Sequence, residues 1–208
     1  MLMTKWGEAL DWEHPLPEYP RPQLRRESYL NLNGIWEYAV STVNSEPEEY
    51  DGEIVVPFPL ESALSGVGRT LMPGEYLWYR RDFELPEGFN IGRVLLHFGA
   101  VDQCARVWVN GVDACVHTGG YLPFSADITE LLEPGVNTLV VRVTDETDAG
   151  YHTRGKQKLK PGGIWYTPVS GIWQTVWCES VPENYIASLF ILCLIHISEP
   201  TRPRLISY

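Results

Sequence analysis

The chain has 208 residues, a formal net charge of −11 and a pI of about 4.9. This length fits one domain of ordinary size with a leader, and the acidic balance excludes a nucleic-acid partner, which would need a clustered basic surface. The first 12 residues contain neither the basic segment nor the apolar segment of a secretory signal, so we expect a cytoplasmic protein.

The N-terminal segment, residues 1–28, is rich in proline and aromatic residues and has no helical or strand periodicity. We expect an extended leader here. Two arrangements remain open: the leader packs against folded structure, or it is a partly disordered arm.

From Tyr29 onward, short apolar and β-branched segments alternate with turn signals such as Asp51-Gly52 and Asn110-Gly111. Only Ile128–Leu132 predicts a short helical turn. The spacing predicts an all-β sandwich over residues 29–186. The predicted strands are Gly34–Val40, Glu53–Val56, Tyr76–Glu84, Arg93–Phe98, Gln103–Asn110, Val112–Thr118, Phe124–Asp127, Thr138–Thr144 and Gly171–Glu179.

The four cysteines are Cys104, Cys115, Cys178 and Cys193. A tight turn at Asn110-Gly111 would place Cys104 opposite His117, so Cys104 and Cys115 are diagonal rather than paired. Without a secretory signal, we expect free buried thiols. No cysteine or histidine spacing predicts a metal site.

The stretch Gly163–Trp177 reads GIWYTPVSGIWQTVW and is the most aromatic part of the chain. Its second half alternates, which predicts a strand with Ile172, Gln174 and Val176 on one face and Trp173, Thr175 and Trp177 on the other. Aromatic rings can stack on the apolar faces of sugar rings, whereas the simpler interpretation is a sandwich core built from large residues.

The longest irregular stretch, residues 145–170, precedes this strand. A loop of this length inside a sandwich is either functional or disordered. Its carboxylate, guanidinium, amide and aromatic groups suit a hydroxyl-rich ligand, because polar groups fix hydroxyls while aromatic rings cover the ring face. The candidate binding residues are Asp145, Arg154, Gln157 and Trp165. A solvated basic loop around Arg154 is the alternative.

Six motifs occur in order over roughly residues 30–180, and together they resemble the N-terminal domain of glycoside hydrolase family 2, which includes β-galactosidases and β-glucuronidases. They are Leu32-Asn33-Gly34-Ile35-Trp36, Val55-Val56-Pro57-Phe58-Pro59, Trp78-Tyr79-Arg80-Arg81-Asp82-Phe83, Phe98-Gly99-Ala100-Val101-Asp102, Val107-Trp108-Val109-Asn110-Gly111 and Ser170-Gly171-Ile172-Trp173.

The resemblance implies a jelly-roll, galactose-binding-like β-sandwich at the front of a larger retaining glycosidase, one that acts on a β-galactoside or related glycoside. Arg142-Val143-Thr144-Asp145 is similar to a family pattern whose acidic residue reaches the neighbouring barrel's active site. It implies that Asp145 binds a substrate hydroxyl or helps hold a monovalent cation. A magnesium ion and a homo-oligomeric state of the parent enzyme remain open. The alternative is that Asp145 caps a turn with Asp148.

The chain has no paired-carboxylate motif, no G-x-S-x-G nucleophile elbow and no βα alternation for a barrel. We therefore expect no catalytic residue in the chain and no catalysis by it alone; its partner would be the catalytic barrel of the same protein. Two further alternatives are a stand-alone carbohydrate-binding module and a sandwich interaction domain that binds no sugar.

Residues 187–208 differ in amino-acid composition from the residues that precede them. We expect the start of a linker to the next domain, and within it Leu192–Tyr208 is typical of the translation of a sequencing-library adapter. The alternative is a hydrophobic strand, Leu189–Ile197, that begins the next domain. A membrane anchor is excluded because the apolar run is short and His196 interrupts it.

Overall fold

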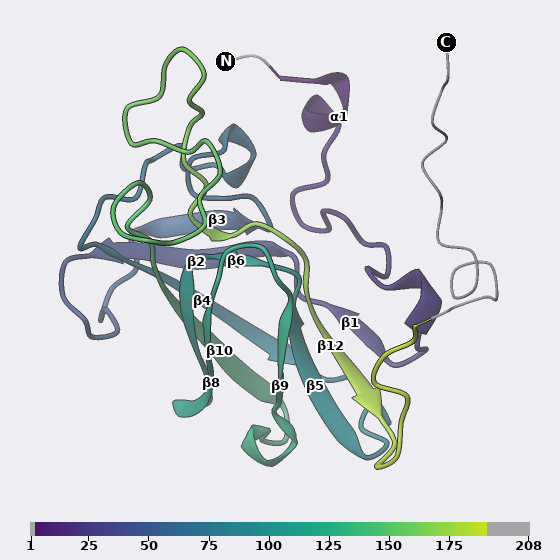
Figure 1. Ribbon diagram of the computed structural model, residues 1–208. Helices are drawn as coiled ribbons and strands as arrows, with labels where there is room; N and C mark the ends of the chain where they lie inside the picture. The colour runs from purple at the N-terminus through teal and green to yellow at the C-terminus, as the bar shows by residue number, and fades with distance from the viewer. Residues whose placement is uncertain (1–2, 191–208) are drawn as a thin grey trace, which may run out of the picture.

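The computed structural model describes residues 3–190, and two antiparallel sheets in it form a β-sandwich of the jelly-roll type (Figure 1). The six-stranded sheet has the order β3 (Gly52–Val56), β2 (Gly34–Ser41), β4 (Tyr76–Glu84), β10 (Val136–Thr144), β7 (Cys104–Val109) and β8 (Val112–Thr118). The four-stranded sheet has the order β1 (Tyr29–Asn31), β12 (Val176–Val181), β5 (Arg93–Phe98) and β9 (Phe124–Asp127).

The remaining elements are short. A two-stranded pairing joins β6 (Val101–Asp102) to β11 (Gly171–Ile172), so the end of the long loop is tied to the start of β7. The helical segments are α1 (Lys5–Glu8), η1 (Pro22–Leu24), η2 (Ala63–Ser65) and η3 (Thr129–Leu131). The segment η3 confirms the predicted helical turn, whereas α1 and η1 lie in the leader where none was predicted.

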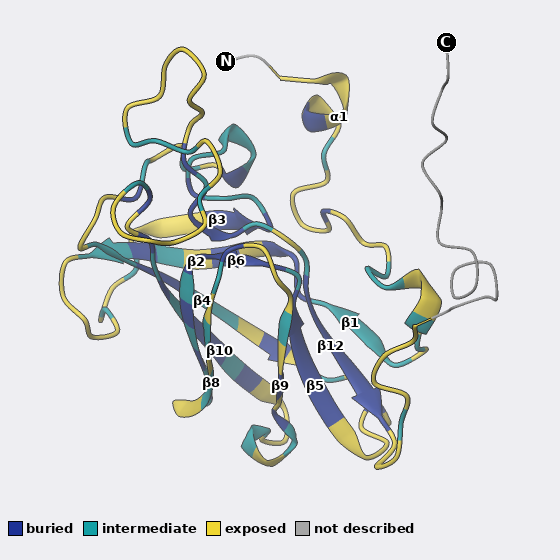
Figure 2. Ribbon diagram, in the orientation of Figure 1, coloured by how far each residue is buried: buried dark blue, intermediate teal, exposed yellow. Residues whose placement is uncertain are grey.

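The core lies between the two sheets, where alternate side chains of facing strands meet (Figure 2). In β4, Leu77 and Tyr79 point inward and are fully buried, and they face Leu96 and Phe98 of β5 within one apolar cluster. The buried Tyr79 hydroxyl accepts a hydrogen bond from Ile172 N at 3.2 Å. The core therefore also fixes the position of β11.

The structure confirms an all-β fold and most predicted strands. The bounds of Tyr76–Glu84, Arg93–Phe98, Val112–Thr118 and Phe124–Asp127 agree fully. Asn110 and Gly111 both have positive φ, 51° and 75°, as a two-residue turn with the twist of the strands requires.

Two register predictions are wrong. The predicted strand Gly171–Glu179 is two strands, because the chain leaves the sheet between Ile172 and Val176. All residues of β12 are buried, and within it the predicted division of faces is confirmed: Val176 belongs to the core cluster, whereas Trp177 lies on the other face, with the Arg21 guanidinium of the leader 5.5 Å from its ring centroid. A bulge in β8 leaves Ala114 unpaired, and therefore Cys104 lies opposite Thr118 rather than His117.

The leader lies across the outer face of the four-stranded sheet, and Figure 1 shows it beside β1 and β12. Arg21 and Tyr19 both donate hydrogen bonds to the Glu179 carboxylate of β12. Asn33 donates to the carbonyl oxygen of Pro15 at 3.1 Å. These contacts explain why β12 is buried on both faces. The proposed boundary between leader and sandwich, near residue 28, stays a prediction.

The three cysteines within the described range, Cys104, Cys115 and Cys178, are free thiols, and Cys178 is buried. Burial raises the pKa of the Cys115 thiol to about 11. Among the described residues, no helix is long and apolar enough to cross a membrane. The fourth cysteine and the predicted adapter-derived segment, residues 192–208, lie outside the described residues.

Candidate functional site

The long loop after β10 begins and ends at one carboxylate. Asp145, the first residue after β10, is 6% exposed. Its Oδ2 accepts a hydrogen bond from Ser170 Oγ at 2.9 Å, and its Oδ1 accepts one from Thr147 N at 2.7 Å. Such an Asx turn supports the left-handed backbone of Thr147, whose φ is 49°. Asp145 therefore closes the base of the loop, and its turn partner is Thr147 rather than Asp148.

Gln157 ties the middle of the loop to the sandwich. Its Nε2 lies 3.3 Å from Asp102 Oδ2, and its Oε1 accepts a hydrogen bond from Val169 N at 2.7 Å. Asp102 ends β6 and is 4% exposed. It packs so closely on Gly120 that a Cβ there would lie 2.3 Å from Asp102 Oδ1. The glycine is therefore required for the carboxylate to occupy this place.

A third carboxylate, from the loop after β3, is hydrogen-bonded to the end of the long loop at Ser170. Glu61 Oε2 accepts a hydrogen bond from Ser170 N at 2.9 Å, and its Oε1 accepts one from Leu71 N at 3.2 Å. Ser170 therefore bonds both Glu61 and Asp145. We call Glu61, Asp102 and Asp145 the acidic cluster.

Electrostatics in the acidic cluster favour the protonated forms. Burial, and secondly the charge of Asp145, raise the pKa of Asp102 to about 7. Burial also raises the pKa of Asp145 and of Glu61, although hydrogen bonds from Thr147 and Ser170 oppose part of that rise. A buried carboxyl group that titrates near neutral pH is a common feature of functional sites.

The other two predicted residues lie further out on the loop. Trp165 is 40% exposed, and Lys158 Nζ lies 4.8 Å from its ring centroid. Backbone hydrogen bonds pair two segments of this loop: Lys158 N donates to the carbonyl oxygen of Tyr166, and Tyr166 N donates to that of Lys156. Within residues 3–190, no hydrogen bond joins the side chains of Arg154 or Trp165 to the acidic cluster. The structure thus brings Asp145 and Gln157 together but not the other two.

Sequence reasoning missed part of the site. Trp173 donates from Nε1 to the carbonyl oxygen of Gly120 at 2.8 Å, and Tyr121 meets its ring edge-on with centroids 6.3 Å apart. Neither Glu61 nor Asp102 was a candidate: Glu61 is one of many scattered acidic residues, and Asp102 ends a family motif to which no binding role was assigned. The only local signal was the paired glycine Gly119-Gly120, which indicates a close backbone approach.

The outer part of the loop exposes apolar side chains, and Figure 2 shows the loop largely in the exposed colour. The exposed apolar residues here are Tyr151, Ile164, Trp165 and Tyr166, with Tyr121 and Leu122 from the neighbouring turn. Buried carboxyl groups, one amide and exposed aromatic rings at one end of the sandwich can together bind hydroxyl groups and cover an apolar ring face.

The described residues contain no group of three or more histidine, cysteine, aspartate or glutamate side chains arranged to hold a metal ion. Both oxygens of Asp145 already accept hydrogen bonds within the loop. The role of Asp145 in holding a monovalent cation, which the family resemblance implies, stays a prediction.

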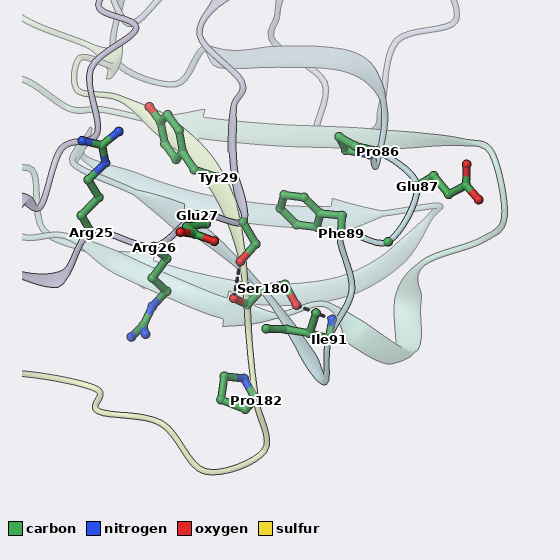
Figure 3. A pocket seen from close by; sticks show the side chains of 12 residues that line it. Arg25, Arg26, Glu27, Tyr29, Pro86, Glu87, Phe89, Ile91, Ser180 and Pro182 are labelled. Carbon is green, nitrogen blue, oxygen red and sulfur yellow. Dashed lines mark hydrogen bonds between the residues drawn. The ribbon is translucent and has the colours of Figure 1, made fainter.

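A hollow of about 670 Å³ lies at the other end of β5 and β12, where the leader meets the sandwich (Figure 3). Tyr29, Phe89 and the arginine pair Arg25-Arg26 line it. Ser180 fixes its floor, because its Oγ accepts a hydrogen bond from Ile91 N at 2.8 Å. None of the residues predicted to bind a ligand lines this hollow.

A jelly-roll sandwich with carboxyl, amide and aromatic groups gathered at one end has the features of a carbohydrate-binding domain. Comparison with known proteins identifies the family. Residues 53–182, more than half of the chain, match the family described as "Glycosyl hydrolases family 2, sugar binding domain". The chain therefore belongs to glycosyl hydrolases family 2.

Individual relatives agree with this assignment. The chain is 30% identical over 174 residues to a β-glucuronidase of Paenibacillus borealis, covering 80% of this chain and 26% of the relative. It is 31% identical over 119 residues to a β-galactosidase of Thermoanaerobacter pseudethanolicus, covering 55% and 15%. A solved β-glucuronidase of an uncultured Clostridium sp. superimposes with a TM-score of 0.57 at 26% identity, covering 77% of this chain and 30% of that one. The chain thus spans about a quarter of the length of the first of these relatives.

Proposed function

We propose that this chain is the sugar-binding domain of a retaining β-glycosidase and that its loop end forms one wall of the substrate pocket. The observation that carries the proposal is the acidic cluster together with Gln157, which is hydrogen-bonded to it, at the base of a loop with exposed aromatic side chains. Carboxyl and amide groups in this setting suit sugar hydroxyls, and the apolar loop surface suits a catalytic domain packed against it.

The proposed substrate is a β-galactoside or a related neutral glycoside. Within the described residues no arginine or lysine is hydrogen-bonded to the acidic cluster, so the cluster offers an anionic sugar no cationic partner and favours a neutral sugar. The second candidate is a β-glucuronide. The names of the relatives favour it, and so does the basic loop segment with Arg154, Lys156 and Lys158. A stand-alone sugar-binding module is the non-enzymatic alternative.

The first test compares the chain with the longer protein encoded at the same locus. Sequencing of the source gene beyond the codon for Ile191 should extend the reading frame into a catalytic domain, and the complete protein should hydrolyse nitrophenyl β-galactoside with retention. The 208-residue chain alone should hydrolyse neither the galactoside nor the glucuronide. A stop codon directly after Tyr208, or a complete protein that hydrolyses neither substrate, would overturn the proposal.

Asp145 can then be tested in the complete enzyme. Asp145→Asn keeps the acceptor for Thr147 N and places an NH₂ group toward Ser170 Oγ, so the loop base should stay closed. Loss of a charged hydrogen bond to a substrate hydroxyl should lower kcat/KM by about 10- to 200-fold. Asp148→Asn, in the same loop, serves as the control and should leave kcat/KM unchanged. Equal kcat/KM values for the two variants would limit Asp145 to a structural role.

A further inference from the structure

The outer face of the six-stranded sheet carries a second hollow, of about 620 Å³, away from the core. Side chains of β4, β7 and β10 line its floor, and the loop after β2 forms one rim through Asn44, Ser45 and Glu46. Its lining includes three arginines and one glutamate, in a chain whose net charge is −11. We call it the arginine groove.

Strand register explains how the floor is built. Arg142 of β10 pairs with Trp78 of β4 on one side and with Arg106 of β7 on the other. In the next row, Val140 separates Arg80 from Trp108. The two indole rings therefore lie on a diagonal across β10. They stack with centroids 5.7 Å apart and planes 20° apart, and Trp108 packs against the cluster that Trp78 forms with Val140.

Two like charges directly opposite each other on neighbouring strands repel. Arg106 has a counter-ion, because its Nε donates a hydrogen bond to Asp113 Oδ2 at 2.9 Å. Arg142 differs: it forms no ion pair within residues 3–190, and its one hydrogen-bond partner there is the neutral side-chain oxygen of Asn44. The groove thus holds one guanidinium without a counter-ion in the described chain, and it lies 5.4 Å from the Tyr76 ring centroid and 5.9 Å from the Trp108 ring centroid.

Two donors in the floor also lack acceptors. Within the described chain, Arg142 Nε and Trp78 Nε1 are buried and have no hydrogen-bond partner, and Trp78 is only 3% exposed. Buried polar groups are nearly always hydrogen-bonded, so these two donors favour a ligand with hydrogen-bond acceptors in the groove. Arg142 lies under this rim, because its guanidinium donates a hydrogen bond to the Asn44 side chain.

We propose that the arginine groove is a saccharide site separate from the loop end and that it takes a sugar carrying a carboxylate or a sulfate. The planar fork of Arg142 matches the geometry of either anion. The exposed part of Trp108 and the Asn110 side of the groove suit the ring and hydroxyls. The inference concerns the isolated chain and does not depend on which glycoside the complete enzyme cleaves.

The test is a titration of the 208-residue chain, followed by the indole NH signals in NMR spectra and by calorimetry. The probes are trigalacturonic acid, galactose 6-sulfate and neutral galactotriose, with sodium acetate and sodium sulfate as anions without a ring. At least one of the two anionic sugars should bind about ten-fold more tightly than galactotriose and than the free anions. Its affinity should fall when NaCl is raised from about 0.05 M to 0.5 M.

Variants locate the site. Arg142→Gln should weaken binding of the anionic sugar by about ten-fold or more, whereas Arg93→Gln should leave it unchanged. Arg93 is a fair control because it is also an exposed strand arginine, paired with Asp127 at 3.6 Å on the other sheet. Asp113→Asn removes the counter-ion of Arg106 and should tighten binding by about three-fold. A merely structural role of these residues would not produce opposite changes.

Three results would overturn the proposal. The first is that neither anionic sugar shifts any indole signal of the folded chain at 10 mM, a concentration far above about 1 mM, where weak sites saturate. The second is equal affinity for neutral galactotriose or for acetate and sulfate, which would leave an adventitious ion only. The third is unchanged affinity in Arg142→Gln with an unchanged melting temperature.

Discussion

Two buried carboxyl groups on this sandwich have opposite surroundings. Glu179, on the outer face of the four-stranded sheet, accepts hydrogen bonds from Arg21, Tyr19 and His97, the last at 3.0 Å. Burial alone would raise the pKa of Glu179, but these bonds lower it to about 2. Asp102, beside other acids, has a pKa raised to about 7 by burial. Cationic partners thus make one carboxylate a structural clamp, and their absence leaves the other able to titrate near neutral pH.

Glu179→Gln should produce the largest loss of stability. The substitution preserves shape but leaves Arg21 and Arg26 beside a neutral amide, with Arg26 Nε 3.3 Å from the former carboxylate position. Breaking a buried ion pair from one side costs about 3–5 kcal/mol, and the partial exposure of both arginines places the expected loss near 3 kcal/mol. Urea unfolding at pH 7 measures it, with Glu183→Gln, an exposed neighbour, as control.

The same residue predicts an acid-dependent loss of stability. The folded-state pKa of Glu179, about 2, lies below its ordinary value of 4.5. Its contribution is therefore complete above about pH 5 and is lost as the pH falls toward 2. The stability of Glu179→Gln should converge on that of the wild type over this window. A constant difference down to pH 2 would mean that the clamp is not ionic.

Asp102→Asn should change stability in the opposite direction. Because the pKa of Asp102 is about 7 in the folded state and 3.8 ordinarily, the fold prefers the protonated form, and wild-type stability falls as the pH rises from 4 through 7. Asparagine imitates the neutral carboxyl and can still accept from Gln157. The variant should be more stable than wild type by roughly 2 kcal/mol at pH 8.

That difference should shrink toward zero at pH 4, where both side chains are neutral in the fold. Urea unfolding at pH 4, 6 and 8 measures the trend, and Asp148→Asn is the control that should follow the wild-type curve. A difference that is the same at all three pH values would assign the effect to packing against Gly120 rather than to charge.

Local patterns in the sequence explain why the strands were predictable. The segment Cys104–Val109 alternates half-buried and buried residues, and the Asn110-Gly111 turn accepts the positive φ that a tight hairpin needs. The register beyond the bulge at Ala114 was not predictable, because no local signal marks one unpaired residue in β8. The break after Ile172 has a distant cause, since the Trp173 indole leaves the sheet to bond Gly120.

The candidate site was only half predictable for the same reason. Asp145 and Gln157 lie in one loop whose length and polarity stand out, whereas Glu61 and Asp102 reach the site from 84 and 43 positions earlier than Asp145 (145 − 61 and 145 − 102). Long-range pairing of β6 with β11 brings them together, and one sequence does not reveal such pairing. Trp165 was chosen for its residue type alone, and its place on the outer loop depends on a backbone ladder with no sequence signature.

Gln157→Ala should give the smallest effect and sharpen the contrast between the two regions. The change removes one hydrogen bond to Asp102 and one from Val169 N. It leaves the core unchanged, and it leaves the contacts between Glu179 and the leader unchanged. Since each of the two hydrogen bonds contributes about 0.5–1 kcal/mol, global stability should fall by roughly 1–2 kcal/mol, while hydrogen exchange should accelerate mainly at Val169 and along the loop. Loss of the Gln157 bond also removes a contact that lowers the pKa of folded Asp102, so the decline of stability, which starts near the ordinary pKa of 3.8, should extend to a higher pH than in the wild type. Unchanged exchange at Val169 would show that Asp145 alone holds the loop base, whereas faster exchange in β12 would mean that the acidic cluster and the Glu179 clamp are one cooperative unit.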